Sequence, residues 1–599
     1  MTKLKNKSSS KIDNKYFDIV VVGAGGAGLR AALELSLAFK NVAVVSKVFP
    51  TRSHTVSAQG GISAAIGNVH SDNWSWHMFD TVKGSDYLGD QDCIEFMCKN
   101  APEVVYELEH MGMPFSRLSN GKIYQRPFGG QSKDFGKGGQ ASRTLAAADR
   151  TGHALLHTLY QKNLQAKTVF FNEFYAIDLV KSASGNIAGI VTLDIATGEL
   201  LFLHAKVVIL ATGGAGQMYQ ATSNALINTG DGIGMALRAG FCVQDMEMWQ
   251  FHPTGLYDKG ILISEGSRGE GGYLLNKHGE RFMERYAPVA KDLASRDVVT
   301  RSIATEILEG RGCGEFGAYI ELKLEHLGLD IIKQRLPGIF ELAMTFAKVD
   351  PSKQPIPIIP TCHYMMGGIP TNRQANVVTV RKNNNINNRI DIDNLYAIGE
   401  CSSISVHGAN RLGGNSLLEL IVFGREAGRD IINKLNLGLD FNETAPDYVE
   451  LAASRFYELQ KKKSGESCWQ IKQELKETMQ NNFGVFKKFE NMQTGILKLK
   501  ELIKRSKEIA LVDHSKIFNT ERIEVLELDN LLSTAMATAI SANAREESRG
   551  AHVRDDFPNR DDQNWLKHTV VFSDNTVMYR PVNLQPDTVA AFMPQGRSY

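Results

Sequence analysis

The stretch FDIVVVGAGGAG at residues 17–28 decides the fold. An apolar run of strand length ends in a glycine-rich turn, a segment of helical composition follows, and Val-Ala-Val-Val at residues 42–45 forms a second apolar run. This order predicts a strand–helix–strand unit. In such a unit Gly23 makes the tight turn, Gly25 lets the backbone approach a pyrophosphate, and Gly28 lets the helix pack close to the strand. The stretch therefore predicts a dinucleotide-binding site.

The choice of dinucleotide depends on the residues after the second strand. An acidic residue that binds the ribose is expected about twenty positions after the glycines, but Ser46 and Lys47 stand there instead. This difference argues against a nicotinamide cofactor and leaves FAD open. Two further apolar runs end near glycine, at residues 205–214 and 393–400. The ends of such strands converge in a doubly wound sheet, so we expect all of them at one site.

Changes of composition along the chain predict four units. Glycine-rich loops and a predicted helix at residues 297–308 mark the middle of the chain. Apolar residues at helical spacing mark its last third. The final fifty residues carry two short strand-like runs. We therefore expect an α/β fold with a doubly wound FAD-binding domain at residues 15–255 and 365–435, an inserted α+β capping domain at residues 256–364, a helical bundle domain at residues 445–545, and a small C-terminal domain at residues 546–599.

The composition excludes several classes of function. The 599 residues carry 67 Lys and Arg against 66 Asp and Glu, a net charge of +1. This balance leaves no basic excess for a nucleic-acid backbone, so we expect no nucleic-acid partner. No run of about 18 apolar residues occurs, so no membrane span is expected. The first fifteen residues are polar and lack the apolar core of a signal peptide, which predicts a short disordered tail on a cytoplasmic, bacterial protein.

The seven cysteines are scattered and include no C-x-x-C pair. They predict neither a disulfide framework nor an iron–sulfur or zinc site in this chain. Any metal centre that serves this protein is therefore expected on another chain.

Polar and cationic side chains stand among glycines at several positions between residues 252 and 411. Any one of them is as well explained by a surface ion pair or a helix cap, but the whole set is not. The set comprises His252, Ser264, Glu265, Arg268, Arg296, His363 and Arg411. Two arginines and two histidines that meet in a cleft would suit a small dicarboxylate, because arginine binds a carboxylate through two hydrogen bonds.

His54 lies in a loop of small and polar residues, TRSHTVSAQGG at residues 51–61. A lone histidine is most often only a hydrogen-bonded polar residue. Here the small neighbours would also let a flat ring system approach the backbone, so a neighbouring isoalloxazine is the alternative interpretation.

Four longer motifs carry a resemblance to a known family. They are RSHTVSAQGG at residues 52–61, EGSRGEGG at residues 265–272, HYMMGG at residues 363–368, and HGANRLGGNS at residues 407–416. With them the chain resembles, from about residue 17 to the C-terminus, the succinate dehydrogenase and fumarate reductase flavoproteins.

The resemblance implies FAD as the cofactor, carried covalently by His54, a link that raises the potential of the flavin. Relatives with free FAD, such as L-aspartate oxidase, lack this histidine. The FAD contacts that the resemblance implies are Gly23, Ala24, Gly25, Gly26, Ala27, Gly28, Ser46, Lys47, Thr51, Ser53, His54, Thr55, Gln59, Gly60, Gly61, Asp231, Glu400, Ser416 and Leu417. The substrate contacts that it implies are His252, Ser264, His363 and Arg411.

The reaction that the resemblance implies is an anti elimination of two hydrogens from succinate, giving fumarate. One hydrogen leaves as hydride to flavin N5, and the other leaves as a proton to Arg296. Arginine is a poor base, because its pKa is above about 12 when free. The family solution is a relay in which Glu265 and Arg268 exchange the proton with Arg296.

Two further positions refine the comparison with the family. Gln59 follows the succinate dehydrogenase pattern, whereas quinol:fumarate reductases tend to have glutamate there, and a negative charge near the flavin would favour the opposite direction. We therefore expect succinate oxidation, with fumarate reduction as the alternative. Ser267 stands where cysteine is common beside the relay arginine, so we expect weak sensitivity to thiol reagents.

The resemblance also implies partners. They are an iron–sulfur subunit, two membrane-anchor subunits that reduce quinone, and a flavinylation assembly factor. These partners imply a peripheral position on the cytoplasmic side of the inner membrane. Two more distant alternatives are a soluble amino-acid oxidase, which His54 argues against, and a non-catalytic FAD-binding scaffold.

Overall fold

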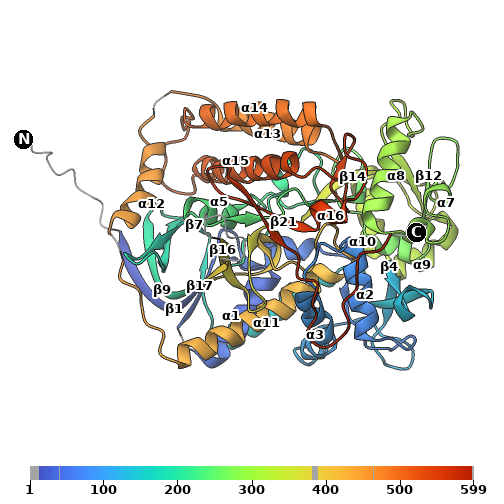
Figure 1. Cartoon of the computed structure of the whole chain (residues 1–599), viewed down its shortest axis with the longest axis horizontal. Coiled ribbons are helices and arrows are strands. Elements are labelled where there is room, and N and C mark those ends of the chain that lie inside the picture. The colour runs from blue at the N-terminus through green and yellow to red at the C-terminus, as the bar shows by residue number, and fades with distance from the viewer. Residues whose placement is uncertain (1–11, 40, 381–388, 445, 463, 597–599) are drawn as a thin grey trace, which may run out of the picture.

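The computed structural model describes residues 12–39, 41–380, 389–444, 446–462 and 464–596. Its largest sheet has the order β16-β17-β9-β1-β2-β6, with β8 joined to the first half of β9 and β7 joined to β8. These strands are β1 (Asp13–Val22), β2 (Val42–Ser46), β6 (Val169–Asn172), β7 (Phe174–Lys181), β8 (Ile187–Asp194), β9 (Leu200–Leu210), β16 (Asn376–Val380) and β17 (Arg389–Ala397). Strands β17, β9, β1, β2 and β6 run parallel, so their carboxyl ends meet at one edge (Figure 1).

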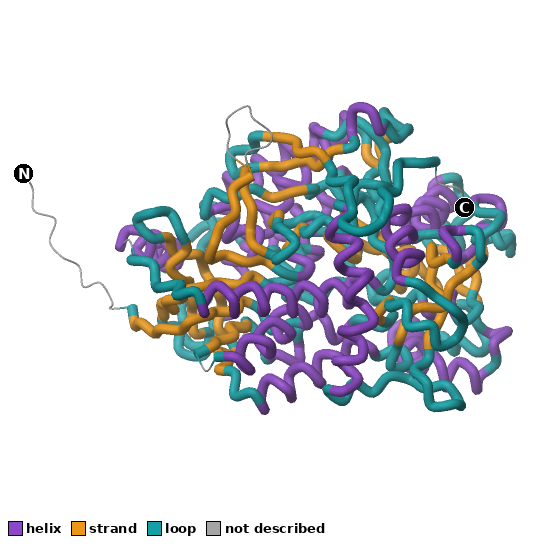
Figure 2. Tube along the Cα trace, turned by 60° about the horizontal axis from the view of Figure 1, so that its bottom comes forward, coloured by secondary structure: helices purple, strands orange, loops and turns teal. Residues whose placement is uncertain are grey.

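Helices cover both faces of this sheet. In Figure 2 the face that comes forward is covered by helices, among them α1 and α11, which pack on each other. The flanking helices are α1 (Gly26–Ala38), α2 (Trp74–Gly84), α3 (Gln91–His110), α4 (Thr151–Gln165), α5 (Asp231–Arg238) and α11 (Asn415–Asn436). The predicted α/β fold with a doubly wound domain is confirmed, because five neighbouring parallel strands are covered by helices.

The start of β1 corrects one expectation. The first fifteen residues were expected to form a disordered tail, but β1 already begins at Asp13, which pairs with Leu201 of β9. Because β9 is eleven residues long, β1 gains hydrogen-bonding partners beyond its apolar core. Residues 1–11 lie outside the described residues.

The middle of the chain adds a second sheet beside the first. It has the order β11-β14-β13-β12, formed by β11 (Trp249–Leu256), β14 (Ile356–Met365), β13 (Ile320–Lys323) and β12 (Tyr273–Leu275). The helices around it are α6 (Gly266–Gly269), α7 (Met283–Tyr286), α8 (Arg296–Leu308), α9 (Leu329–Arg335) and α10 (Pro337–Leu342). The helix expected at residues 297–308 is α8, which begins one residue earlier, at Arg296. Arg296 is also the residue whose side chain is expected to act on the substrate.

Strands β11 and β14 connect two hydrophobic cores. Phe251 and Cys362 belong to the core of the large sheet, whereas Leu256 and Ile358, further along the same strands, belong to the core of the inserted region. The pairing of β11 with β14 thus joins the two regions where the site lies, with register shifts between Gln250 and Phe251 and between His252 and Gly255. The residue borders of the four domains stay predictions.

The region after α11 is mainly helical. It contains α12 (Pro446–Leu459), α13 (Cys468–Asn482), α14 (Phe489–Ser506) and α15 (Thr520–Ala544). Helices α13, α14 and α15 lie along the top of Figure 1. Helix α15 packs against α14 and α13 on one side and against α5 on the other. The final strands, β21 (Lys567–Val571) and β22 (Val577–Pro581), form a sheet with β10 (Val243–Gln244), so the C-terminal region is anchored on an earlier part of the chain.

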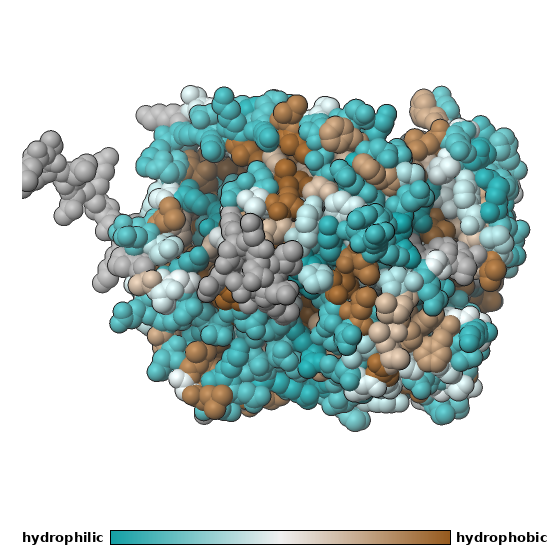
Figure 3. Space-filling view, in the orientation of Figure 1, coloured by the Kyte–Doolittle hydropathy of each residue, from teal (hydrophilic) through white to brown (hydrophobic). Residues whose placement is uncertain are grey.

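In the described part of the chain, the remaining strands form three small sheets, and the remaining α-helix is four residues long. They are β3 (Ile62–Ser63), β4 (Gln125–Ser132), β5 (Gln140–Leu145), β15 (Ile369–Pro370), β18 (Ser402–Ser403), β19 (Phe486–Lys487), β20 (Val553–Arg554) and α16 (Asp562–Trp565). The face shown in Figure 3 is mostly polar, with apolar side chains scattered over it. Within the described residues, no helix has the length and apolar character needed to cross a bilayer.

The contact between α1 and β1 depends on Gly28. A Cβ atom there would lie 2.0 Å from the carbonyl oxygen of Gly23, and backbone cannot move aside as a flexible side chain can. We expect Gly28→Ala to push α1 away from the sheet, to lower the midpoint of thermal unfolding and to abolish FAD binding. At Gly84, the last residue of α2, the nearest atom to an added Cβ is 3.5 Å away. Gly84→Ala is therefore the matched control, and equal melting temperatures for both variants would contradict the prediction.

Candidate functional site

One long cavity opens where the parallel strands end. Its empty space, with the solvent at its opening included, is about 1510 Å³. It extends from the ends of β1, β2 and β9 to the inserted region. The predicted site residues that line it are Gly23, Ala24, Gly25, Gly26, Ala27, Ser46, Lys47, Ser53, His54, Thr55, Gln59, Gly60, Gly61, Asp231, His252, Ser264, Glu265, Arg296, His363, Glu400, Arg411, Ser416 and Leu417.

Three predicted site residues do not line the cavity. Gly28 packs on the backbone of Gly23, and Thr51 lies in a short 3-10 turn before His54. Arg268 is buried behind Glu265 and donates a hydrogen bond to the carbonyl oxygen of Asp292. The backbone N–H of Arg268 donates to the Glu265 carbonyl at 3.0 Å, but no hydrogen bond joins the two side chains among the described residues. Any proton relay between these side chains therefore acts through charge or through a bridging group.

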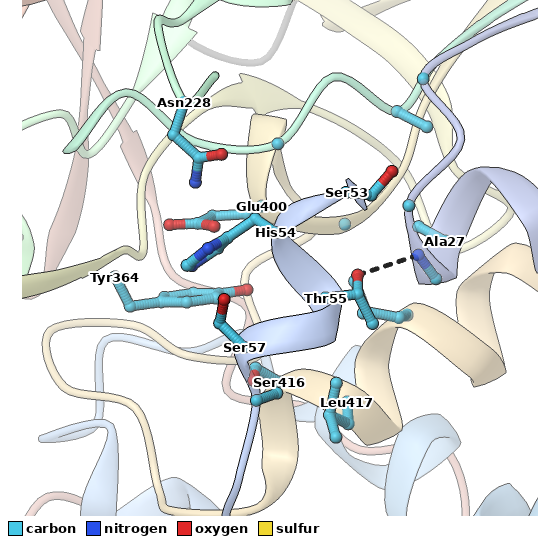
Figure 4. A pocket seen from close by; sticks show the side chains of 18 of the residues that line it. Ala27, Ser53, His54, Thr55, Ser57, Asn228, Tyr364, Glu400, Ser416 and Leu417 are labelled. Carbon is cyan, nitrogen blue, oxygen red and sulfur yellow. Dashed lines mark hydrogen bonds between the residues drawn. The ribbon is translucent and has the colours of Figure 1, made fainter. Parts of the chain in front are cut away.

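The glycine turn fits a pyrophosphate. Helix α1 has no acidic residue in its first turn, and its N-cap, Gly25, makes no side-chain cap. The Gly26 N–H donates to the Thr55 hydroxyl oxygen at 3.0 Å (Figure 4). The rest of this helix end faces the cavity. Unpaired N–H groups and the helix dipole attract anions at such an end. The residues present therefore fit the FAD that the sequence predicts.

His54 lines this cavity, as do Tyr364 and Glu400 (Figure 4). The Ala225 N–H lies 3.3 Å from its Nδ1 and donates to it. Burial lowers the pKa of His54 to about 4. The ring is therefore neutral at physiological pH and keeps a lone pair, which an imidazolium lacks.

Two arginines from separate elements meet at the far end of the cavity. Arg296 opens α8, Arg411 lies in the glycine-rich loop before α11, and both are buried. Gln250 of β11 joins them, because its Oε1 accepts from Arg296 Nη1 and from Arg411 Nη2, each at 3.1 Å. Its Nε2 donates to the Arg411 carbonyl at 2.7 Å and to Asn410 at 2.9 Å, which fixes the amide orientation.

Glu265 compensates one of these cations. Its Oε2 accepts from Arg296 Nε at 2.6 Å, and its Oε1 accepts from the Gly129 N–H at 2.8 Å. Burial alone would raise the pKa of Glu265, but Arg296 and Arg268 hold it below its ordinary value. Glu265 is thus a carboxylate at neutral pH and can accept a proton from Arg296.

Arg411 has no such partner. No carboxylate lies within 4 Å of it among the described residues, and its Nε atom makes no hydrogen bond. Its guanidinium stacks on the ring of Tyr364 at 4.3 Å. Burial and the charge of Arg296 lower the pKa of Arg411 to about 9. A bound anion would relieve this buried, uncompensated charge.

Two histidines complete this end of the cavity. Burial, and then the arginines nearby, lower the pKa of His252 and of His363 well below the ordinary value, so both rings are neutral. The Thr254 N–H donates to Nδ1 of His252 at 3.2 Å, which leaves the proton on Nε2. Nδ1 of His363 is 2.8 Å from the Ser223 hydroxyl. A neutral histidine held in this way can donate a hydrogen bond to an anionic ligand.

Gln59 and Ser264 face each other across the cavity wall. The Ser264 N–H donates to Oε1 of Gln59 at 3.1 Å, and Nε2 of Gln59 donates to the Leu262 carbonyl at 3.3 Å. The amide therefore connects the loop of His54 to the inserted region through both a donor and an acceptor. A glutamate there would lose the donor and place a carboxylate opposite a carbonyl oxygen.

Several residues in or beside the cavity were not predicted from the sequence. Gln250 lies inside an apolar strand, where no pattern marks a polar residue as functional. Tyr175 and Asn228 line the cavity without belonging to any glycine-rich motif. Ser267 is fully buried, and its hydroxyl donates to the Ser264 carbonyl at 2.7 Å. The described residues hold no group of three or more His, Cys, Asp or Glu side chains arranged for a metal ion.

Comparison with known proteins agrees with this site. A family model described as "FAD binding domain" matches residues 18–417, and one described as "Fumarate reductase flavoprotein C-term" matches residues 472–599. The succinate dehydrogenase flavoprotein subunit of Coxiella burnetii is 57% identical over 589 residues, covering 98% of this chain and 100% of that protein. The fumarate reductase flavoprotein subunit of Escherichia coli is 41% identical over 578 residues, covering 93% of this chain and 92% of that protein. A solved E. coli quinol fumarate reductase has a TM-score of 0.89 at 38% identity, covering 98% of this chain and 99% of that chain.

Glu400 predicts a pH dependence of the FAD-free chain. Burial raises its pKa to about 7 from 4.5. The folded state therefore binds its proton more tightly than the unfolded state, and stability falls as pH rises from 4.5 to about 7. We expect this fall to reach the order of 3 kcal/mol. Melting temperatures measured across this window should decline less steeply for Glu400→Gln.

The matched control is Glu490→Gln, because the Glu490 side chain is 69% exposed. Its melting temperatures should follow the unsubstituted chain at every pH. An unchanged pH slope in Glu400→Gln would contradict the prediction.

Proposed function

This chain belongs to the succinate dehydrogenase and fumarate reductase flavoprotein family, and we propose that it oxidises succinate to fumarate as the flavoprotein subunit of a succinate dehydrogenase. The observation that carries the proposal is the pair of guanidinium groups, Arg296 and Arg411, that Gln250 joins on the wall of the FAD cavity. The chain is also more similar to succinate dehydrogenase subunits than to the E. coli fumarate reductase subunit.

The charges at this end of the cavity suit a dicarboxylate. Arg411 would bind one carboxylate, because it is cationic, buried and without an anionic partner. His252 and His363 would donate hydrogen bonds as neutral rings, and Ser264 would add a hydroxyl. Binding both ends of a short dicarboxylate fixes its central carbon pair, and fixed geometry supplies much of the rate in such reactions.

Arg296 is placed to receive the proton. Bound FAD supplies an acceptor for two electrons, taken from a carbon–hydrogen bond as hydride. As one Arg296 nitrogen takes a proton from the substrate, the proton on Nε can pass to Glu265 along the 2.6 Å hydrogen bond. This exchange lets Arg296 act as a base without lasting loss of its charge. The buried cation of Arg268 lies behind the Glu265 carboxylate and would be the next group in the proton relay.

His54 would carry the covalent link to FAD. Its ring is neutral, and the Ala225 N–H donates to Nδ1. A ring alkylated at Nε2 keeps its one lone pair on Nδ1, where this donor already lies. The geometry therefore favours Nε2 as the bonding atom.

Electrons that leave the flavin would pass to partner subunits. We propose an iron–sulfur subunit, two membrane-anchor subunits that reduce quinone, and a flavinylation factor during assembly. A peripheral position on the cytoplasmic side of the inner membrane follows from those partners. The supporting finding is the likeness to quinol fumarate reductase structures over nearly the whole chain.

Arg296→Gln tests the proton transfer. We expect at least a hundredfold loss of succinate-dependent dye reduction in the assembled complex, since acid–base groups contribute about 10²–10⁴ in rate. FAD content should not change. Arg301→Gln is the control, because Arg301 lies on the same helix and contacts Asp297 and the Gly550 carbonyl, away from the cavity. Full activity in Arg296→Gln would refute its role, and lost activity with FAD retained would exclude a purely structural protein.

His54→Ser tests the covalent link. We expect the denatured unsubstituted protein, expressed with its flavinylation factor, to give a flavin-fluorescent band under ultraviolet light, and the variant to give none. The folded variant should still bind FAD reversibly, because the glycine turn is intact. A dark band from denatured but natively yellow protein would mean that the flavin is not covalently held, and would favour fumarate reduction or amino-acid oxidation.

A further inference from the structure

The ammonium group of Lys47 is fully occupied by protein. Lys47 follows β2 and lines the cavity, but its Nζ donates to Thr229 Oγ1 at 2.7 Å, to Asp231 Oδ2 at 2.7 Å and to Glu527 Oε1 at 2.6 Å. An ammonium has three donors. Lys47 therefore faces the cavity with its backbone and its methylene groups. Its ammonium group binds the three protein acceptors instead of a ligand.

Two of these acceptors come from helices far apart in sequence. Asp231 is the first residue of α5, and Glu527 lies on α15 in the helical region. Both carboxylates are more than nine-tenths buried. Burial alone would lower the pKa of Lys47, but Asp231 and Glu527 raise it above its ordinary value. The three groups therefore form a buried charged cluster between two regions of the chain.

One face of α15 continues this contact. Asn530, one turn after Glu527, donates to Asp231 Oδ1 and to the Tyr175 hydroxyl, each at 2.9 Å. One further turn along, Thr534 lies so close to Gly230 that a Cβ there would be 2.6 Å from its hydroxyl. Residues 527, 530 and 534 lie on one side of a helix. Figure 1 shows α15 running past α5, the helix that begins at Asp231.

The position of this cluster relates it to the ribose of a dinucleotide. In doubly wound folds an acidic residue at the end of the second strand binds the ribose, and Lys47 stands near that position here. Asp231 brings a carboxylate to the same end of the cavity. Its Oδ1 accepts from Thr229, Asn530 and Tyr175, whereas its Oδ2 accepts only from Lys47 among the described residues. Oδ2 therefore keeps capacity for a ligand hydroxyl.

We propose that α15 is part of the FAD site and that Glu527 is a positioning residue for the ribose end of FAD. Glu527 does not line the cavity; it holds Lys47, which in turn holds the Asp231 carboxylate toward the ligand. Removing one partner of a buried ion pair is strongly destabilising because it leaves a charge uncompensated. Loss of Glu527 would thus release Lys47 and Asp231 and weaken FAD binding, although the glycine turn is untouched.

The test compares FAD affinities in the full-length chain carrying His54→Ser, so that binding is reversible. Flavin fluorescence titration gives the dissociation constant of this parent and of the same protein with Glu527→Gln added. We expect at least tenfold weaker binding with Glu527→Gln. The matched control is Asp529→Asn, because Asp529 lies on the same helix, is 49% exposed and pairs with Arg455. The control should stay within twofold of the parent.

A second readout separates positioning from general stability. A purely structural role would lower the melting temperatures of the FAD-free and FAD-bound chains equally, whereas the proposal predicts a smaller rise of melting temperature on adding FAD. Should Glu527→Gln not fold, Asn530→Ala replaces it under the same criterion. Unchanged FAD affinity in a folded variant would overturn this inference but would leave the proposed function standing. The inference rests on FAD occupying this cavity, so a parent that binds no FAD would overturn the proposed function as well.

Discussion

The ion pair between Glu265 and Arg296 is the interaction on which the site depends. Guanidinium groups as deeply buried as Arg268, Arg296 and Arg411 are costly unless anions compensate them. Glu265 compensates the first two, and its carboxylate is fixed by the Gly129 N–H. Arg411 is left without an anion among the described residues, and burial together with the charge of Arg296 lowers its pKa to about 9. The site is electrostatically complete only with an anionic ligand, which explains why a dicarboxylate fits it.

The fold places these charges beside a cofactor cavity through two sets of strands. The parallel strands end at one edge and present glycine backbone there, while β11 and β14 run from the core of the large sheet into the inserted region. Gln250 on β11 then fixes the distance between Arg296 and Arg411. The helical region reaches the opposite end of the cavity through α15. The cofactor cavity is thus bounded by parts of the chain that are hundreds of residues apart.

Short-range signals in the sequence predicted much of this arrangement. The glycine turn, the apolar strands around it and the helix at Arg296 follow from local periodicity and turn chemistry, and the resemblance to a family supplied most of the residues that line the cavity. Gln250 was not predictable, because a polar residue inside an apolar strand looks like a satisfied core side chain. Glu527 was not predictable either, since nothing in the sequence of α15 indicates that it meets Lys47. The position of Arg268 behind the cavity, and the early start of β1, depend on tertiary packing that no local pattern encodes.

The central claim is that bound FAD and the paired arginines form one site for succinate. The most direct measurement is the absorbance of the FAD-loaded protein after anaerobic addition of succinate. The account predicts that succinate bleaches the flavin band and that fumarate restores it. A flavin that dithionite reduces, but that succinate leaves unchanged at saturating concentration, would contradict the account.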